Sequence, residues 1–195
     1  PDMGPALLGL ADVLDIRGES AEALAVLQRA RVSLADRPEL ADVLFRLGVV
    51  YTRLERYDET RDVYEQYVAL PMESEARGSG LCNLAETYVS LGDLPRAVAT
   101  YHACVDLRPD YAGAWWGLAS ALARAGRGAE AERAGREALN RAPDWQGIRG
   151  PNVFYVPAYD VHYYEALAFH AMDKLEPELA AWERYLSEGG AQGRF

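Results

Sequence analysis

The sequence has very little lysine, cysteine and histidine. Lys174 is the single lysine, so nearly all of the 20 basic residues are arginines, and against 30 acidic residues they leave a net charge of −10. A surface for nucleic acid or for an anionic membrane needs a net basic face, so we expect neither partner. Arginine favours planar, bidentate contacts with carboxylates over the mobile point-charge contacts of lysine.

The two cysteines, Cys82 and Cys104, are too few for a disulfide framework or a structural zinc site. We therefore expect small, buried, reduced thiols and a cytoplasmic location. The chain has no apolar run near the ~18 residues of a membrane helix and no signal peptide at its first residues. Residue 1 is not methionine, so the chain reads as a fragment or processed form, and an exported or periplasmic location stays open.

What the sequence has in abundance is a repeated helical pattern. Stretches that begin with leucine and a small residue recur at Leu10, Leu47, Leu84 and Leu118, in steps of 37, 37 and 34 residues. Each reads as a helix, a turn and a second helix. Leucines and aromatics at helical spacing form the seam, and the small residues allow close helix packing. Glycine at the turn, as at Gly92, supplies a left-handed end to the first helix.

This pattern resembles the tetratricopeptide repeat family, whose antiparallel helix pairs recur every ~34 residues. The resemblance implies an all-α, right-handed solenoid that forms a single domain of about five repeats. Pattern breaks at Asp173 and Glu178 mark the fifth repeat, where the family usually has glycine and alanine. We place the repeats at residues 4–37, 41–74, 78–111, 112–145 and 159–190, with an insertion at 146–158.

Signs of catalysis are weak. His162, Glu165 and His170 share a helical face, but the two histidines are eight residues apart, about 12 Å along a helix. One metal ion with ligands near ~2 Å does not span that distance alone. No nucleophile elbow or phosphate loop is present. We therefore expect no enzyme activity, no metal and no cofactor.

The resemblance instead implies a scaffold that binds a protein or peptide in a concave groove lined by the first helix of each pair. Arginines on that face would favour an acidic segment; the alternative is that they are solvated residues paired with Glu55, Glu59 or Glu86. Chaperone-tail binding is disfavoured, because Phe45 and Val49 stand where lysine and asparagine are expected. The expected groove residues are Leu8, Asp12, Asp15, Phe45, Arg46, Val49, Arg53, Cys82, Asn83, Glu86, Ser90, Trp116, Ser120, Arg124, Tyr163, Leu167 and His170.

A second hypothesis is structural. Trp182, Tyr185 and Leu186 lie near an end with no capping helix in this sequence, so the repeats could stack with copies of themselves or fasten a larger complex.

The insertion before the fifth repeat is rich in aromatic residues. Gly135 stands on a second helix where the sister repeats have Leu27, Tyr64, Tyr101 and Trp182, which leaves a large volume to fill. We predict that Trp145, Phe154 or Tyr155 packs beside Gly135. The alternative is that the insertion's aromatics reach into the groove beside Trp116.

Overall fold

The computed structural model describes residues 3–143, 146–149 and 155–189, and within them all regular structure is helical. The prediction of an all-α fold of helical hairpins is confirmed. The helices are α1 (Gly4–Ile16), α2 (Ser20–Ser33), α3 (Leu40–Arg53), α4 (Tyr57–Ala69), α5 (Ser74–Ser90), α6 (Leu94–Leu107), α7 (Ala112–Arg124), α8 (Gly128–Arg141), α9 (Gln146–Arg149), α10 (Asp160–Ala171) and α11 (Leu175–Ser187).

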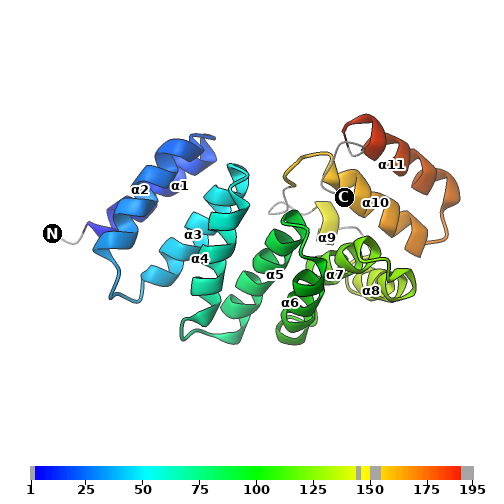
Figure 1. Cartoon of the computed structure of the whole chain (residues 1–195), viewed down its shortest axis with the longest axis horizontal. Helices are drawn as coiled ribbons and strands as arrows, with labels where there is room; N and C mark the ends of the chain where they lie inside the picture. The colour runs from blue at the N-terminus through cyan, green and yellow to red at the C-terminus, as the bar shows by residue number, and fades with distance from the viewer. Residues whose placement is uncertain (1–2, 144–145, 150–154, 190–195) are drawn as a thin grey trace. The chain divides into compact units, whose positions relative to one another are not determined.

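The helices form hairpins that belong to two compact units. Unit 1 spans Pro1–Glu73 and contains the pairs α1/α2 and α3/α4, while unit 2 spans Ser74–Phe195 and contains α5/α6, α7/α8 and α10/α11. Figure 1 shows the two helices of each pair side by side, joined by a short turn. The short α9 falls in the expected insertion and packs against α7 and α10.

The five turns inside the hairpins share one backbone conformation. In each, a residue with positive φ follows the first helix, and the next residue's N–H bonds back to a carbonyl five residues earlier, as in Arg56 N to Tyr51 O at 2.9 Å. This is the Schellman arrangement, which satisfies carbonyls left open at a helix end. The positive-φ residues are Gly18 (77°), Glu55 (55°), Gly92 (74°), Gly126 (72°) and Asp173 (56°).

The core of unit 1 follows from the spacing of apolar residues. On α3 the buried residues Val43, Leu44, Leu47, Val50 and Tyr51 recur at helical spacing and so form one face. Each fully buried leucine or valine stabilises the fold by about 1.5–3 kcal/mol relative to exposure.

Close approach between paired helices requires glycine at one position of α3. A Cβ atom on Gly48 would lie 2.3 Å from the ring of Tyr64, a fully buried residue of α4. The predicted role of this small residue is therefore seen directly in the packing.

The expectation of free cysteines is wrong for this structure. Cys82 on α5 and Cys104 on α6 are both buried and are joined by a disulfide, with their Cα atoms 5.4 Å apart. The bond links the two helices of one hairpin. Sequence reasoning missed it because two cysteines that are 22 residues apart in sequence become neighbours only when the hairpin closes.

None of the helices in the described ranges is both long enough and apolar enough to cross a membrane.

Candidate functional site

The first-helix face of unit 1 carries two ion pairs between α1 and α3. Arg46 donates from Nε to Asp12 Oδ1 at 2.6 Å and from Nη2 to Asp12 Oδ2 at 3.1 Å. Arg53 Nη1 lies 2.7 Å from Asp15 Oδ1. The hydrogen bonds that Arg46 donates to Asp12 raise the pKa of the Arg46 guanidinium. Both arginines thus pair with aspartates on α1, whereas the sequence suggested glutamates as their partners.

The two apolar residues predicted for this face are only partly exposed. The ring of Phe45 packs against Tyr64 and Tyr67, with centroids 6.0 and 5.4 Å apart. Val49 is also of intermediate exposure. The first-helix face of unit 1 therefore combines ion-paired arginines with partly exposed apolar side chains.

In unit 2 the predicted residue Glu86 is engaged by two tyrosines. Its Oε2 atom accepts a hydrogen bond from Tyr101 at 2.6 Å and another from Tyr164, on α10, at 3.0 Å. Burial and the nearby Glu86 carboxylate raise the pKa of both phenols well above the ordinary value. Glu86 links α5, α6 and α10, and both Glu86 and its α5 neighbour Asn83 are partly exposed.

Arg124 does not present its side chain at an open groove. The side chain is 2% exposed, and its guanidinium carbon lies 4.2 Å from the centroid of the Tyr163 ring, with Asp160 Oδ1 at 3.9 Å. Burial alone would lower the pKa of Arg124, but interactions with Tyr164, Asp160 and Glu86 outweigh it and raise the pKa. Arg124 and Tyr163 therefore form an internal cation–π contact between α7 and α10.

Trp116 and Ser120 are also internal, with exposed fractions of 1% and 0%. The insertion contributes to this burial: a Cβ on Gly147 of α9 would lie 3.0 Å from Trp116 Cδ1, and the neighbouring Ile148 is itself 1% exposed. The α7 part of the expected groove is thus covered by the protein's own chain.

Among the described residues, Trp116 and Ala171 supply the atoms nearest to Gly135. A Cβ on Gly135 would lie 3.2 Å from Trp116 Cζ3 and 3.4 Å from the Cβ of Ala171. Tyr155 packs instead against Tyr164, at 5.2 Å between centroids, and donates to the carbonyl of Ile148. The prediction is therefore wrong for Tyr155, and the other two aromatics, Trp145 and Phe154, lie outside the described residues.

Glu165 anchors the insertion through charge. This carboxylate is 2% exposed, and it pairs with Arg149 of α9, with Arg184 Nη2 of α11 at 3.6 Å and with His162 Nδ1 at 2.9 Å. His170 lies elsewhere, in contact with Glu178 at 3.2 Å. Among the described residues, no three histidine, cysteine or acidic side chains cluster as metal ligands.

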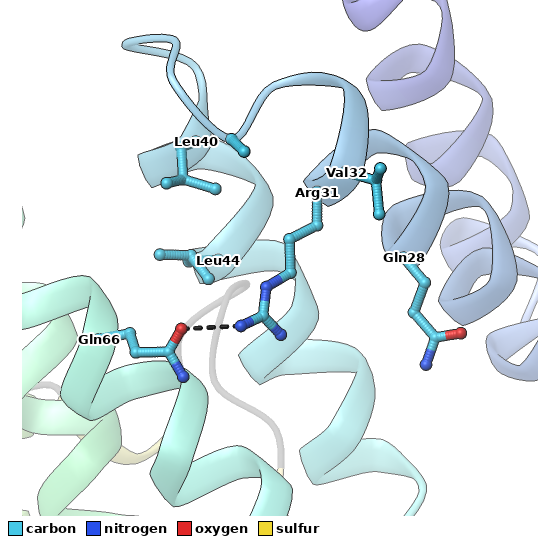
Figure 2. A pocket seen from close by; sticks show the side chains of 7 residues that line it. Gln28, Arg31, Val32, Leu40, Leu44 and Gln66 are labelled. Atoms are coloured by element: carbon cyan, nitrogen blue, oxygen red, sulfur yellow. Dashed lines mark hydrogen bonds between the residues drawn. The ribbon is translucent and has the colours of Figure 1, made fainter.

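A pocket in unit 1 was not predicted at all. It lies between α2, α3 and α4, has a volume of 630 Å³, and places Val32, Leu40 and Leu44 near three polar side chains, Gln28, Arg31 and Gln66. Figure 2 shows the guanidinium of Arg31 reaching across to Gln66, where Nη2 donates to Oε1 at 2.8 Å.

One signal in the sequence could have revealed this pocket. Val32 is 80% exposed and lies next to Arg31, off the face of α2 that buries Leu24, Leu27 and Ala30. A single exposed apolar residue is common on protein surfaces, so Val32 becomes informative only through its place beside Arg31 at the pocket. The family resemblance pointed only to the first-helix face.

The family model for the tetratricopeptide repeat matches residues 8–75 and 82–147, which is more than half of the chain. The chain therefore belongs to the tetratricopeptide repeat family. Proteins of this family are generally non-catalytic scaffolds for protein–protein interaction. No curated protein matches the sequence.

Solved structures with the same fold cover nearly the whole chain at low identity. YrrB, a tetratricopeptide repeat protein with an unusual peptide-binding site, is 20% identical over 93% of this chain and 84% of its own, with a TM-score of 0.60. MamA from Desulfovibrio magneticus RS-1 is 14% identical over 98% of both chains, with a TM-score of 0.66. A putative kinesin light chain from Podosopora anserina is 19% identical over 100% and 99%, with a TM-score of 0.67.

Proposed function

We propose that this protein is a non-catalytic scaffold that binds a carboxylate-bearing segment of a partner protein in the pocket between α2, α3 and α4. The observation that carries the proposal is Arg31, which lines the pocket together with Leu40 and Leu44 of α3. A guanidinium beside a hydrophobic pocket suits a ligand with an aliphatic side chain next to a carboxylate.

The hydrogen-bond partner of Arg31 differs from those of the other candidate arginines. Its hydrogen bond goes to the amide oxygen of Gln66, which is a neutral acceptor, so this contact does not offset the positive charge of the guanidinium. Arg46 and Arg53 each face an aspartate within 2.7 Å. A carboxylate arriving at either of them must compete with an existing pair, which is worth about 0.2–1 kcal/mol.

The first-helix face remains the second candidate surface for the same function. Its accessible part in unit 1 comprises Phe45, Arg46, Val49 and Arg53, and in unit 2 it comprises Asn83 and the partly exposed Glu86. Burial of Trp116, Ser120 and the Arg124 side chain makes the α7 part unsuitable for a partner in this conformation.

A peptide-display selection tests the proposal with no need to identify the partner first. Peptides selected on the wild-type protein should be rich in acidic residues or bind through their free C-terminus. Arg31→Ala should weaken them at least about tenfold, because a charge-assisted hydrogen bond contributes about 1.5–3 kcal/mol.

Two variants serve as controls in that selection. Arg61→Ala removes an arginine of α4 that pairs with Asp58 and Asp62, so it makes the same charge change outside the pocket. Its affinity should stay within about twofold of wild type. If the Arg46→Ala, Arg53→Ala double variant loses binding and Arg31→Ala does not, the proposed pocket is wrong and the first-helix face is the binding surface.

Self-association is a second candidate function, and exposed leucines on α11 favour it. Leu175, Leu179 and Leu186 are 73%, 52% and 56% exposed, and at 100° per residue they lie within about 40° of one another around the helix. Trp182 and Tyr185, which we expected at such a contact, pack into the ring cluster with Tyr163. Concentration-dependent sedimentation that Leu179→Glu abolishes would support assembly through this stripe.

A further inference from the structure

A second pocket lies in unit 2, between the α7/α8 and α10/α11 pairs, and its chemistry is opposite to that of the first. Its volume is 200 Å³. One side carries His170 on α10 with Glu178 and Trp182 on α11, and the other carries Glu132 of α8 among small residues such as Ala123 and Ala131.

Glu178 occupies a position where a carboxylate is unexpected. The corresponding residues of the other second helices are Ala23, Thr60, Ala97 and Ala131, and all four are buried and small. The side chain of Glu178 is 19% exposed. A small residue at this position is compatible with the hairpin in four repeats, so the carboxylate is not needed for the packing of the hairpin.

The carboxylate is held in place by two neighbours. Trp182 Nε1 donates to Glu178 Oε1 at 3.3 Å, and His170 Nδ1 lies 3.2 Å from the same carboxylate. Trp182 is fixed in turn by its edge-on contact with Tyr163, with centroids 5.1 Å apart. A charged group that is only partly exposed and held in a fixed orientation requires little reordering to receive a ligand.

The lining selects for positive charge on an apolar stem. Glu132 of α8 supplies a second carboxylate at the pocket, where it pairs with Arg136, and Trp182 is the side-chain type that binds cations best. The alanine wall and Leu167 offer apolar contact for a short aliphatic chain. The volume is below the ~300–1,000 Å³ of sites for drug-sized ligands, which suits a single side chain or a small ion.

We propose that this pocket binds one alkylammonium or guanidinium group on an aliphatic stem. The group comes either from a lysine or arginine side chain of a partner protein or from a free small amine. The net charge of −10 on the whole chain raises the local concentration of either.

The indole N–H resonance of Trp182 reports on the pocket, because that N–H contacts the Glu178 carboxylate. We would assign the resonance with Trp182→Phe and titrate the full chain with n-butylammonium and N-acetylarginine amide at constant ionic strength. The expected result is a saturable shift with a dissociation constant in the millimolar range. The neutral isostere n-butanol should bind at least about tenfold more weakly.

Glu178→Ala separates binding from folding, because it introduces the residue that sister repeats carry. It should keep the helical circular dichroism of wild type and weaken both cations at least about tenfold. Glu137→Ala, on α8 and paired with Arg141, makes the same charge change elsewhere and should leave the affinity unchanged. Unsaturable shifts, equal binding of n-butanol, or wild-type affinity in Glu178→Ala would each overturn the proposal.

A last comparison identifies the source of the cation. If a short peptide containing one arginine binds at least about tenfold more tightly than N-acetylarginine amide, the ligand is a partner's side chain. If the two bind equally, it is a free amine. Arg31→Ala should leave all these titrations unchanged. The experiment can therefore refute cation binding at Glu178 without affecting the proposal of carboxylate binding at Arg31, and the reverse also holds.

Discussion

Trp116 and Gly135 pack directly against each other: the Cζ3 atom of the indole lies 3.2 Å from the position that a Cβ on Gly135 would take. Part of the volume that Gly135 leaves open is thus taken by an indole from α7, and Gly135 also lines the 200 Å³ pocket of unit 2. The opposite edge of the same indole, at Cδ1, meets Gly147 of α9. One side chain therefore joins the repeat core to the insertion.

This arrangement makes Trp116 far more important for stability than its sequence neighbour Trp115. Trp116→Ala should cost about 3–5 kcal/mol of unfolding free energy, as expected for removal of a fully buried tryptophan. Trp115 is partly exposed, stacks with Arg141 and donates to the Pro109 carbonyl, so Trp115→Ala should cost about 1–2 kcal/mol. Urea denaturation followed by circular dichroism measures both. Equal costs would contradict the described packing.

The left-handed turns predict two stabilising substitutions. Glu55 and Asp173 hold φ angles of 55° and 56°, where a side chain costs about 1–2 kcal/mol and glycine costs little. Glu55→Gly and Asp173→Gly should each raise the melting temperature, by about 2–4 °C per kcal/mol gained. Gly92→Ala, which makes the reverse change at φ 74°, should lower it. A drop in melting temperature for either glycine variant would contradict this interpretation of the turns.

The Tyr101 and Tyr164 phenols predict a loss of stability at alkaline pH. Burial and Glu86 raise their pKa in the folded state, so the folded chain holds these protons more tightly than the unfolded chain does. Their contribution is complete below the ordinary tyrosine pKa of about 10 and is lost as pH rises above it.

Tyr101→Phe isolates the contribution of one phenol. Between about pH 10 and 11, wild type should lose up to about 1.4 kcal/mol more per pH unit than the variant, as measured by urea denaturation at a series of pH values. Parallel pH profiles for the two proteins would contradict a raised Tyr101 pKa.

The disulfide between Cys82 and Cys104 predicts a redox-dependent stability. Iodoacetamide should modify neither cysteine in the denatured, unreduced protein and both after reduction, as read by intact mass. Reduction should cost about 3 kcal/mol for a loop closed over 22 residues. Modification of both thiols before reduction would show that the pair is not joined.

Local pattern was enough to predict the hairpins. The turn at Gly92 follows from glycine beside an amphipathic helix, and Ala97 is buried as its small-residue position predicts. These features depend on residues within one repeat. The same is true of the contact between Gly48 and Tyr64, which joins the two helices of one hairpin.

The candidate site was harder to predict because its determinants come from different repeats. Arg53 and Arg124 occupy the same place on their first helices, two residues before the left-handed turn residue, yet Arg53 meets an aspartate of α1 while Arg124 is buried with Tyr163 and Asp160 of α10. The position of a residue within its repeat predicts which face of the helix it lies on. It does not predict which side chains of a neighbouring hairpin pack against that face. The insertion does not follow the repeat pattern, so the sequence offered its contact with Trp116 only as an alternative.

The central claim is that a partner's carboxylate binds at Arg31 and not on the first-helix face. Methyl NMR tests it most directly, because Val32, Leu40 and Leu44 line the pocket while Val49 marks the other surface. A selected acidic peptide would be titrated into protein with labelled leucine and valine methyl groups. We predict shifts at Val32, Leu40 and Leu44 that Arg31→Ala removes. Shifts centred on Val49, with the pocket methyls unmoved, would contradict the account.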